Sequence, residues 1–572
     1  MALGILEPRT DSRLPGTELL VDDDQYEREG AQGRLKHGKG KKTDIILIPQ
    51  PSDDPNDPLL WPTWKRESAF FFIFLNCIVF AACPGPMIAP ATVALASQLH
   101  VPIKHVAQLS GYQLLIVGAL GPLVSVFAQK YGKRPQFLVA SVFGVIGTGI
   151  CVASFSEASL KTSYRVLLAG RMIQGIGTTA YESLSVAAIG DMFFLHERGL
   201  RTALLVLTLA SMSSFIAVVA GKLFEDLGAR MLFVVLLPIQ AVAAVGVVLF
   251  VPEMQFRREE TGSDNITVDV AAEEKNASEK HEGVTDSQAT TPRYANSTTT
   301  STARGTDPTK RRRTFLQDLR VSSGTYSQDS TFKLLGSIFI HFLNPAVLWI
   351  QIVSAVLVSF FVGTAYTLAQ TFTPPPYRLT VSQNGYFFSG ALIGGVIGII
   401  SGPLCDFIAR RLARRNKGIF EAEFRIPICV VAVVVFGVGW FVFGWALDEG
   451  KKAAGERVIG PGQIVVVCSV CYGCVCFATS VASTGAGLYV LDAFPNHATE
   501  IFILQMMIKN FLFYAFSSFI NDFAAEKGPA HMARVFGIAT LAGFTTCVPM
   551  YVFGKINRAA VSRWRWMRSF RS

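Results

Sequence analysis

The sequence predicts an all-α integral membrane protein with twelve transmembrane helices in two pseudo-symmetric six-helix bundles. Half of the 572 residues are hydrophobic and only 16% are charged, whereas an ordinary soluble protein carries roughly 25% charged residues. The apolar residues form long runs in two sets of six. In addition, the segment after the second run resembles the segment after the eighth. These three observations together predict the fold class.

Each apolar run is long enough to cross a hydrocarbon core of about 30 Å as a helix. The first six fall near 68–91, 107–128, 136–155, 165–187, 202–221 and 231–251. The other six fall near 346–370, 384–404, 426–446, 463–487, 500–521 and 534–553.

The chain therefore divides into five parts. We expect a cytoplasmic N-terminal tail at 1–67, a first bundle at 68–251 and a linker at 252–331. A short in-plane helix and the second bundle follow at 332–553, and a basic cytoplasmic tail at 554–572. The linker is rich in Ser, Thr, Glu and Lys, so it cannot bury enough apolar surface to order itself and is expected to be disordered. The in-plane helix is the stretch "TFKLLGSIFIHFLNP", which Pro345 closes.

Lysine and arginine residues near the ends of the spans predict the orientation. They cluster before the first run, in the loop after the second, in the linker, in the loop after the eighth and in the C-terminal tail. With twelve spans these segments share one side, so we expect both termini in the cytoplasm. We also expect the protein to lie in the plasma membrane. The net charge of +10 then indicates contact with the lipid bilayer and not with nucleic acid. We expect a monomer.

The sequence indicates no cofactor, metal or enzymatic activity. The run "CSVCYGCVC" holds four of the ten cysteines. It is apolar and lacks a histidine or carboxylate partner, so we expect these thiols to pack in the bundle. The phosphate-binding pattern of ATP-driven pumps, Gly-x4-Gly-Lys-Ser/Thr, is absent. No Ser/His, HExxH or paired-Asp motif appears either.

An internal repeat relates the two halves. "SVFAQKYGKRP" (125–135) and "GPLCDFIARRL" (402–412) align at an offset of 277, which places Arg410 and Arg411 opposite Lys133 and Arg134. Repeated six-span halves are typical of transporters whose halves rock about a central site. We expect gating contacts at the span ends from Lys133, Arg134, Asp191, Arg198, Asp406, Arg410, Arg411 and Asp492.

The chain resembles the major facilitator superfamily, specifically the fungal drug:proton antiporter-1 type near its histidinol and polyamine carriers. Asp406, Arg410 and Arg411 match the family's loop motif, and Arg171-Met-Ile-Gln174-Gly175 matches its fourth-span motif. Three departures are visible: Ala409 replaces a glycine, Gln129 replaces the first-half acid, and Gly221 and Gly228 lack the Gly-Pro pair of the fifth-span motif. The resemblance covers 54–555 and implies a proton-coupled transporter, but it leaves the direction of transport open.

Two charged residues, Arg171 and Glu182, lie within the predicted fourth span, "GRMIQGIGTTAYES", where a charge costs at least a few kcal/mol. They share one helix face about 16 Å apart, so each needs its own partner. Gly175 and Gly177 lie between them and allow a close neighbouring helix. We expect Glu182 to accept a proton and Arg171 to bias its pKa or to bind an anionic substrate group. Alternatively, Arg171 binds backbone carbonyls and Glu182 pairs with a loop cation.

Further polar residues in the spans are candidates for substrate and proton binding. For substrate these are Asn76, Tyr112, Gln113, Gln174, Tyr366, Asn384, Tyr386 and Asn510, and for proton coupling Lys509 joins Arg171 and Glu182. Amides and aromatic rings suit a planar or cationic substrate. Packing is the alternative for each of them, and Lys509 could instead extend its ammonium group to the bilayer surface.

The sequence therefore predicts a proton-driven secondary transporter of small organic molecules, in which substrate and proton compete during alternating access. Export of drugs or of a fungal secondary metabolite is the first expectation. Uptake of small cations such as polyamines or histidinol is the alternative. A non-transporting membrane receptor, with the linker as its signalling arm, is a distant third.

Overall fold

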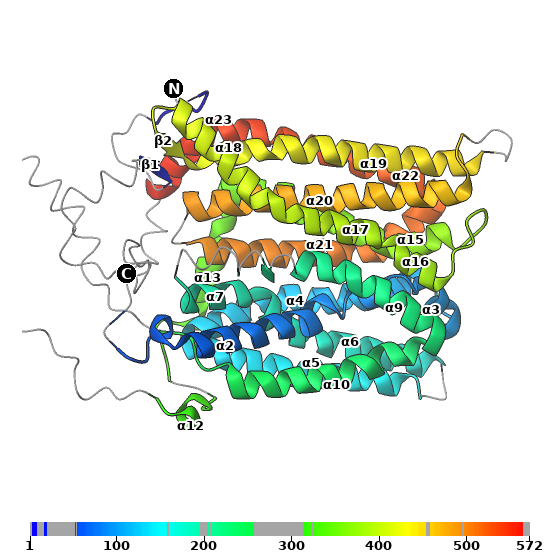
Figure 1. The fold of residues 1–572 in the computed structure, drawn as a ribbon, viewed down its shortest axis with the longest axis horizontal. Coiled ribbons are helices and arrows are strands. Elements are labelled where there is room, and N and C mark those ends of the chain that lie inside the picture. The colour runs from blue at the N-terminus through cyan, green and yellow to red at the C-terminus, as the bar shows by residue number, and fades with distance from the viewer. Residues whose placement is uncertain are drawn as a thin grey trace, which may run out of the picture.

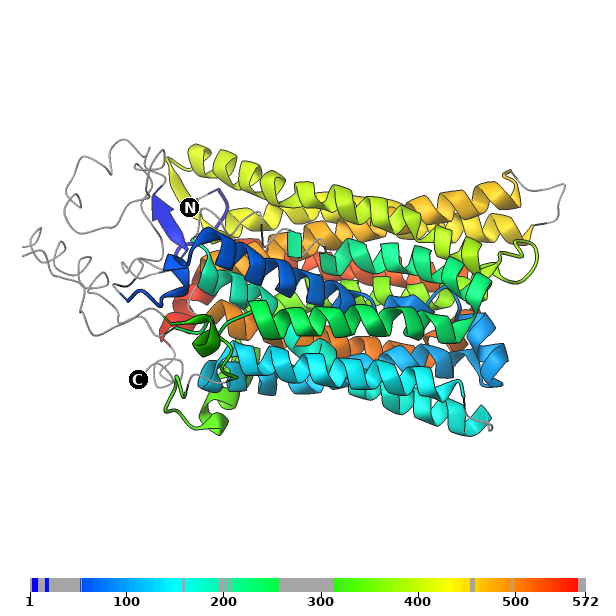
Figure 2. The same cartoon turned by 60° about the horizontal axis from the view of Figure 1, so that its bottom comes forward.

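A computed structural model gives the fold. It describes residues 3–8, 16–19, 52, 54–156, 160–194, 201, 204–205, 208–256, 313–321, 324–452, 458–494 and 497–563. The described helices run side by side between two ends of one elongated bundle (Figures 1 and 2). One end carries the strands β1 (Thr17–Leu19) and β2 (Ile419–Glu421) and the helix α12 (Phe315–Asp318), and we call it the terminal end. The opposite end carries α3 (Thr92–Leu99) and α16 (Val381–Phe387).

Six crossings make the first half, and they follow the first six predicted runs in order. They are α2 (Thr63–Asn76) with the π-helix η3 (Cys77–Ala82), α4 (Ile103–Tyr131), α5 (Lys133–Ser154), α6 (Leu160–Ser183) with α7 (Ser185–Met192), η5 (Thr208–Met212) with α9 (Ser213–Leu227), and α10 (Ala229–Phe250). The first crossing breaks after η3, and the short helix η4 (Pro86–Ile88) connects it to α3.

Six further crossings make the second half. They are α14 (Pro345–Ile350), η8 (Gln351–Val356) and α15 (Leu357–Phe372); α16, α17 (Ser389–Ile397), η9 (Gly398–Ile400) and α18 (Ser401–Arg415); η10 (Ala422–Ile428) and α19 (Cys429–Lys451); α20 (Pro461–Ala493); α21 (Ala498–Lys527); and α22 (Pro529–Thr545) with α23 (Cys547–Arg563). The predicted helix at 331–345 is present as α13 (Thr331–Ile340) and η7 (His341–Leu343), and Pro345 begins α14.

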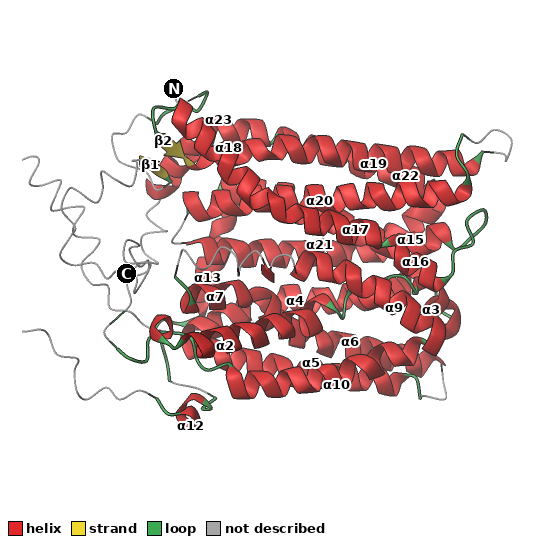
Figure 3. Ribbon diagram, in the orientation of Figure 1, coloured by secondary structure: helices red, strands yellow, loops and turns green. Residues whose placement is uncertain are grey.

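Helix is almost the only regular structure in the described residues, as Figure 3 shows. By length and composition, nine helical stretches of this part of the chain could cross a membrane. The first, fourth and fifth predicted spans are not among them. The first is broken at Cys83–Gly85, and the fourth carries Arg171 and Glu182. The stretch leading into the fifth is only partly described.

Glycine sets two of the tight turns between neighbouring crossings. Gly132 separates α4 from α5 with a φ of +99°, and Gly228 separates α9 from α10 with a φ of +81°. L-residues with a side chain rarely adopt this conformation, which lets the chain reverse directly after a helix. The basic loop motif around Gly132 is therefore held in a fixed turn.

The two halves pack closely at the opposite end. A Cβ atom on Gly221 of α9 would lie 2.8 Å from the Val381 carbonyl and 2.9 Å from the Gly385 Cα atom of α16. An ion pair of 3.0 Å joins Lys104 of α4 to Asp522 of α21. Because these contacts connect the first half to the second, the bundle is closed at this end.

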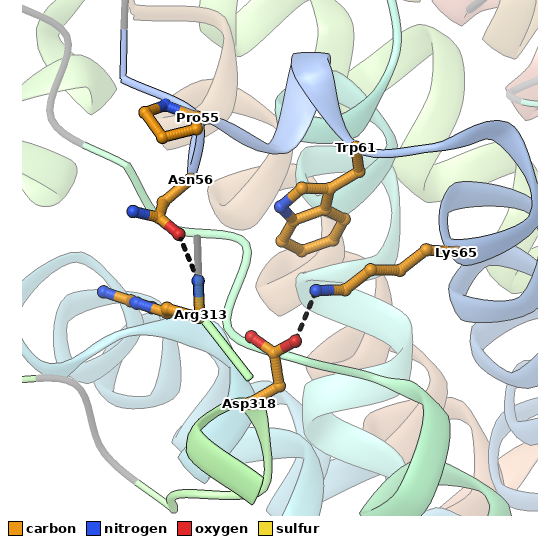
Figure 4. Close-up of a pocket in the computed structure, with 6 residues that line it drawn as sticks. All are labelled: Pro55, Asn56, Trp61, Lys65, Arg313 and Asp318. Carbon is orange, nitrogen blue, oxygen red and sulfur yellow. Dashed lines mark hydrogen bonds and ion pairs between the residues drawn. The ribbon is translucent and has the colours of Figure 1, made fainter. Parts of the chain in front are cut away.

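Chain segments outside the spans cover the terminal end. The last residues of the linker bind the first half, since Lys65 pairs with Asp318 at 2.5 Å and the Arg313 backbone N–H donates to Asn56 at 2.9 Å (Figure 4). The cavity between these groups measures about 10 Å³, which is room for no more than one water molecule. It is therefore a contact between segments and not a ligand site.

The N-terminal tail, by contrast, binds the second half. Strand β1 pairs antiparallel with β2, Thr17 lying opposite Glu421, and Ile5 is fully buried against Ala409, Ala413 and Phe424. The predicted disordered linker covers 252–331 and the predicted basic tail covers 554–572. Residues 257–312, 322–323 and 564–572 lie outside the described residues, whereas the linker contains α12 and the first part of the tail continues α23.

The glycine contact between α9 and α16 yields a first prediction. Gly221→Val should force the two helices apart and shift the bundle toward an arrangement open at the opposite end. Spin labels attached to Gln98→Cys in the first half and Glu526→Cys in the second report the separation of the halves at this end. Double electron–electron resonance should then give a longer distance between the two labels than in the protein with Gly221.

The control is Gly149→Val in α5, where an added Cβ meets no atom within 4 Å. A folded Gly221→Val protein with the distances of the wild type would contradict the proposed closing role of this contact.

Candidate functional site

The buried guanidinium of Arg171 in α6 holds the break in the first crossing. Its Nη1 donates to the Pro84 carbonyl at 2.6 Å and to Gln174 Oε1 at 2.9 Å, and its Nη2 donates to Ser110 Oγ at 2.9 Å. The sequence "CPGP" interrupts the helix, so the Pro84 carbonyl has no helical partner and needs a donor from elsewhere. Arg171 thus takes the backbone-binding role that the sequence left open as an alternative.

The network around Arg171 continues in both directions. Gln174 donates to Thr148 at 2.8 Å, Thr148 donates to Gln240 at 2.6 Å, and these bonds tie α6 to α5 and α10. From the second half, the Tyr366 hydroxyl of α15 donates to the Gly85 carbonyl at 2.7 Å. The break at 84–85 is therefore a junction at which the two halves meet.

Glycines bring α6 close to its neighbours, as the sequence predicts. An added Cβ on Gly175 would lie 2.5 Å from the Gln113 carbonyl of α4, and one on Gly177 would collide with Gly144 of α5. Gln113 itself donates to Thr178 of α6 at 3.3 Å. These approaches let short side chains reach the Arg171 network.

Glu182 pairs with Lys509 of α21, which belongs to the other half. The Glu182 side chain is 10% exposed and that of Lys509 is 29% exposed. As their spacing predicts, Glu182 and Arg171 do not pair, and each has its own partners. The partner of Glu182 is therefore not a cation from a loop, because Lys509 lies in the middle of a crossing. The Lys509 ammonium group likewise binds Glu182 and does not extend to the bilayer surface.

Further polar side chains lie along the same crossings. Asn510 is fully buried beside Gly118 of α4, and neither of its amide atoms has a partner among the described residues. Gln505 donates to Ser354 of η8 at 2.5 Å, and Ser354 bonds Ser483 of α20 at 2.9 Å. Gln505, Ser354 and Ser483 were not among the site residues predicted from the sequence. The four-residue spacing of Gln505 and Lys509 in an apolar run was the available signal.

Four other residues predicted to bind substrate lie apart from the Arg171 network and the Glu182–Lys509 pair. Asn76 donates to the Phe72 carbonyl at 2.7 Å and to the Ala243 carbonyl at 3.1 Å, so it joins α2 to α10. Tyr112 packs against Tyr514 with ring centroids 5.1 Å apart. Asn384 and Tyr386 are in α16 at the opposite end, where Asn384 bonds Thr373 at 3.1 Å and Tyr386 is 51% exposed.

Ion pairs at the terminal end repeat between the halves. Lys133, which begins α5, pairs with Asp191 of α7. Arg425 of η10 pairs with Asp492 of α20 at 2.8 Å and also with Asp406. The Lys133–Asp191 and Arg425–Asp492 pairs each join the start of the third crossing of their half to the end of the fourth. Asp406 is one of the gating residues predicted from the sequence, which named no partner for it, and its partner in the structure is Arg425. Arg198 lies outside the described residues.

Residues 69–517 match the sequence profile of the Major Facilitator Superfamily. The chain belongs to this superfamily of transporters. An uncharacterised MFS-type transporter of Schizosaccharomyces pombe is 24% identical, covering 95% of this chain and 92% of the relative. Protein HOL1 of Saccharomyces cerevisiae is 23% identical over 96% of each chain. The probable efflux pump mfs2 of Aspergillus flavus is 22% identical, covering 77% of this chain and 91% of the relative.

Solved structures of the superfamily share the fold. The xylose transporter XylE of Escherichia coli, in a partially occluded inward-open conformation, gives a TM-score of 0.52 at 12% identity, covering 86% of this chain and 98% of that chain. A D-xylose–proton symporter gives 0.53 at 15% identity, covering 85% and 97%. The predicted fold class of twelve helices in two halves is confirmed.

Glu253 and Arg558, which lie near the ends of the sixth and twelfth crossings, were not predicted from the sequence to form contacts between crossings. Glu253, just after α10, accepts the backbone N–H groups of Lys133 and Arg134, each at 3.1 Å, and so caps α5. Burial raises the pKa of Glu253. An acid from after the sixth crossing thus caps α5, whereas position 129 at the end of α4 carries a glutamine. In the second half the charges are reversed, because Arg558 of α23 donates to Glu423 at 2.6 Å and to Glu421 at 3.0 Å.

The Arg171 network yields a prediction on stability. Arg171→Ala should lower the free energy of unfolding by about 3 kcal/mol, since it leaves the Pro84 carbonyl, Ser110 and Gln174 buried without their donor. Thermal unfolding of the purified protein measures this. Arg165→Ala is the control, because Arg165 is an exposed residue six positions earlier on the same helix. Equal melting temperatures for the two variants would contradict the assignment.

Proposed function

We propose that this chain is a proton-coupled secondary transporter of small organic molecules. Its two halves rock about the central polar groups, with the terminal end in the cytoplasm of a plasma-membrane monomer. Glu182 accepts the coupling proton, Lys509 is its counter-ion, and Arg171 positions the broken first crossing. The superfamily match and the similarity to named efflux pumps support export as the direction.

The observation that carries the proposal is the Glu182–Lys509 pair, because it connects a crossing of the first half to one of the second. An ion pair in a region of low dielectric is stable only while both groups are charged. Protonation of Glu182 removes its electrostatic attraction to the Lys509 ammonium group, which is then left without its counter-ion. Proton binding therefore weakens one contact between the halves, and proton release restores it.

Arg171 does not share this role. Its guanidinium stays charged at all physiological pH values, and its partners are the Pro84 carbonyl, Ser110 and Gln174. It contributes by holding the first crossing in a bent path where Tyr366 of the other half also binds. A rocking movement that separates Tyr366 from Gly85 frees a carbonyl that a substrate donor then occupies.

A second candidate, transport of small amine cations, is favoured by the chemistry of Lys509. Its ammonium group already occupies the position beside Glu182 that an amine substrate would take. Amine and proton then compete for one carboxylate, and Lys509 fills the site between cycles. This mechanism serves uptake as well as export, and it distinguishes cationic from neutral substrates.

Glu182→Gln tests the coupling role. Transport by proteoliposomes should lose its response to an imposed pH gradient, with a fall of roughly tenfold or more in the gradient-driven rate. Labelled spermidine and a panel of dyes, assayed with and without a protonophore, give the measurement. Asp226→Asn is the control, since Asp226 is an exposed acid at the opposite end of the bundle. Unchanged pH dependence in Glu182→Gln would remove this residue from the mechanism.

Lys509→Gln tests the competition between lysine and substrate. If an amine replaces Lys509 at Glu182, this variant should bind spermidine several-fold more tightly and leave the affinity for neutral dyes unchanged. Lys222→Gln, which removes an exposed lysine, should alter neither. Weaker spermidine binding in Lys509→Gln would argue against the cation mechanism and for a neutral or anionic substrate.

A further inference from the structure

Four arginines stand exposed on the last two turns of α18 at the terminal end. They are Arg410, Arg411, Arg414 and Arg415. No ion pair of the described residues involves any of them, and the nearby acid Asp406 is engaged by Arg425. Like charges four positions apart on a helix destabilise it, and here 410 faces 414 and 411 faces 415. The arrangement therefore favours an anion from outside the helix.

The internal repeat shows that these arginines are not needed for the ion pairs of the second half. Their aligned counterparts in the first half, Lys133 and Arg134, are only 7% and 1% exposed. Lys133 is paired with Asp191, and Arg134 donates to the Val248 and Leu319 carbonyls at 2.8 and 3.2 Å. In the second half Arg425 takes over the pairing with the aspartates. Arg410 and Arg411 are thus released for another contact.

Their position on the helix indicates where that contact lies. The crossing that contains α18 exposes Ile393, Ile400 and Phe407 by 59%, 59% and 61%, which is the pattern of a face turned to lipid. Arg411 and Arg414 follow Phe407 by about 6 and 10 Å along the helix axis. A hollow beside this part of α18 is lined by Pro403, Asp406, Phe407 and the four arginines, and the Asp406 carboxylate is paired with Arg425. The cations therefore begin where the apolar face ends, at the depth of lipid headgroups.

We propose that this arginine face of α18 binds an anionic phospholipid whose headgroup carries more than one phosphate. A guanidinium presents two parallel N–H donors that match the oxygens of a phosphate group. Arg410 with Arg414, and Arg411 with Arg415, offer two such rows within one headgroup's reach. Phe407 packs against the upper part of the acyl chains. Basic clusters at the end of a membrane helix recognise anionic lipids in this way.

The experiment uses the full chain in detergent, with phosphatidylinositol bisphosphate or phosphatidylcholine added and bound lipid counted by native mass spectrometry. The wild type should retain the bisphosphate lipid in preference to phosphatidylcholine. Arg410→Gln with Arg414→Gln should reduce its retention roughly tenfold or more. Arg165→Gln with Arg230→Gln, two exposed arginines at the opposite end, should retain it like the wild type.

Two further arms separate the possible explanations. Arg410→Lys with Arg414→Lys keeps the charge but loses the paired donors, and an intermediate loss would support recognition by the guanidinium groups. If the glutamine variant fails to fold, this lysine variant still carries the test. Equal retention by all variants would overturn the proposal. Soluble inositol trisphosphate binding as tightly as the whole lipid would also overturn it, because a free phosphate would then be the ligand.

Discussion

A charged or polar group surrounded by lipid must find its partners inside the protein, since no water is present to replace them. Arg171 and the broken first crossing satisfy each other under this constraint. The Pro84 carbonyl needs a donor, and the guanidinium needs acceptors. Ser110, Gln174, Thr148 and Gln240 complete the set. Much of the first half depends on this exchange, because the helices must approach closely enough for short side chains to reach the centre. Gly175 and Gly177 provide that approach.

The Arg171 network and the Glu182–Lys509 pair differ in which parts of the bundle they connect. The three hydrogen bonds of the Arg171 guanidinium lie within the first half, so this residue fixes the path of the first crossing. The Glu182–Lys509 pair instead joins the two halves. In the proposed mechanism, a change in the protonation of Glu182 acts on this contact. Tyr366 provides the one link from the second half into the Arg171 network among the contacts described above. The Arg171 network and the Glu182–Lys509 pair thus both reach the interface between the two halves.

The ends of the crossings show how a repeat diverges while its geometry persists. Lys133–Asp191 and Arg425–Asp492 occupy equivalent places in the two halves. Around them the chemistry differs: Glu253 caps α5 in the first half, whereas Arg558 binds Glu421 and Glu423 in the second. Arg425 makes the ion pairs with the aspartates in the second half, whereas the arginines aligned with Lys133 and Arg134 are exposed. Alignment alone would assign both basic pairs one function.

The sequence by itself determined the spans and the two halves, because they follow from the order of the apolar runs and from the internal repeat. It also determined that Arg171 and Glu182 cannot pair, because that follows from their distance along one helix. It also indicated the break in the first crossing, since proline and glycine act locally. Only the tertiary structure decided that Lys509, 327 residues away, is the partner of Glu182. The same holds for Asn76, which faces α10, and for Asn384 and Tyr386, which lie at the opposite end. The period of a helix tells which residues share a face, but the packing of all twelve crossings sets which neighbour that face meets.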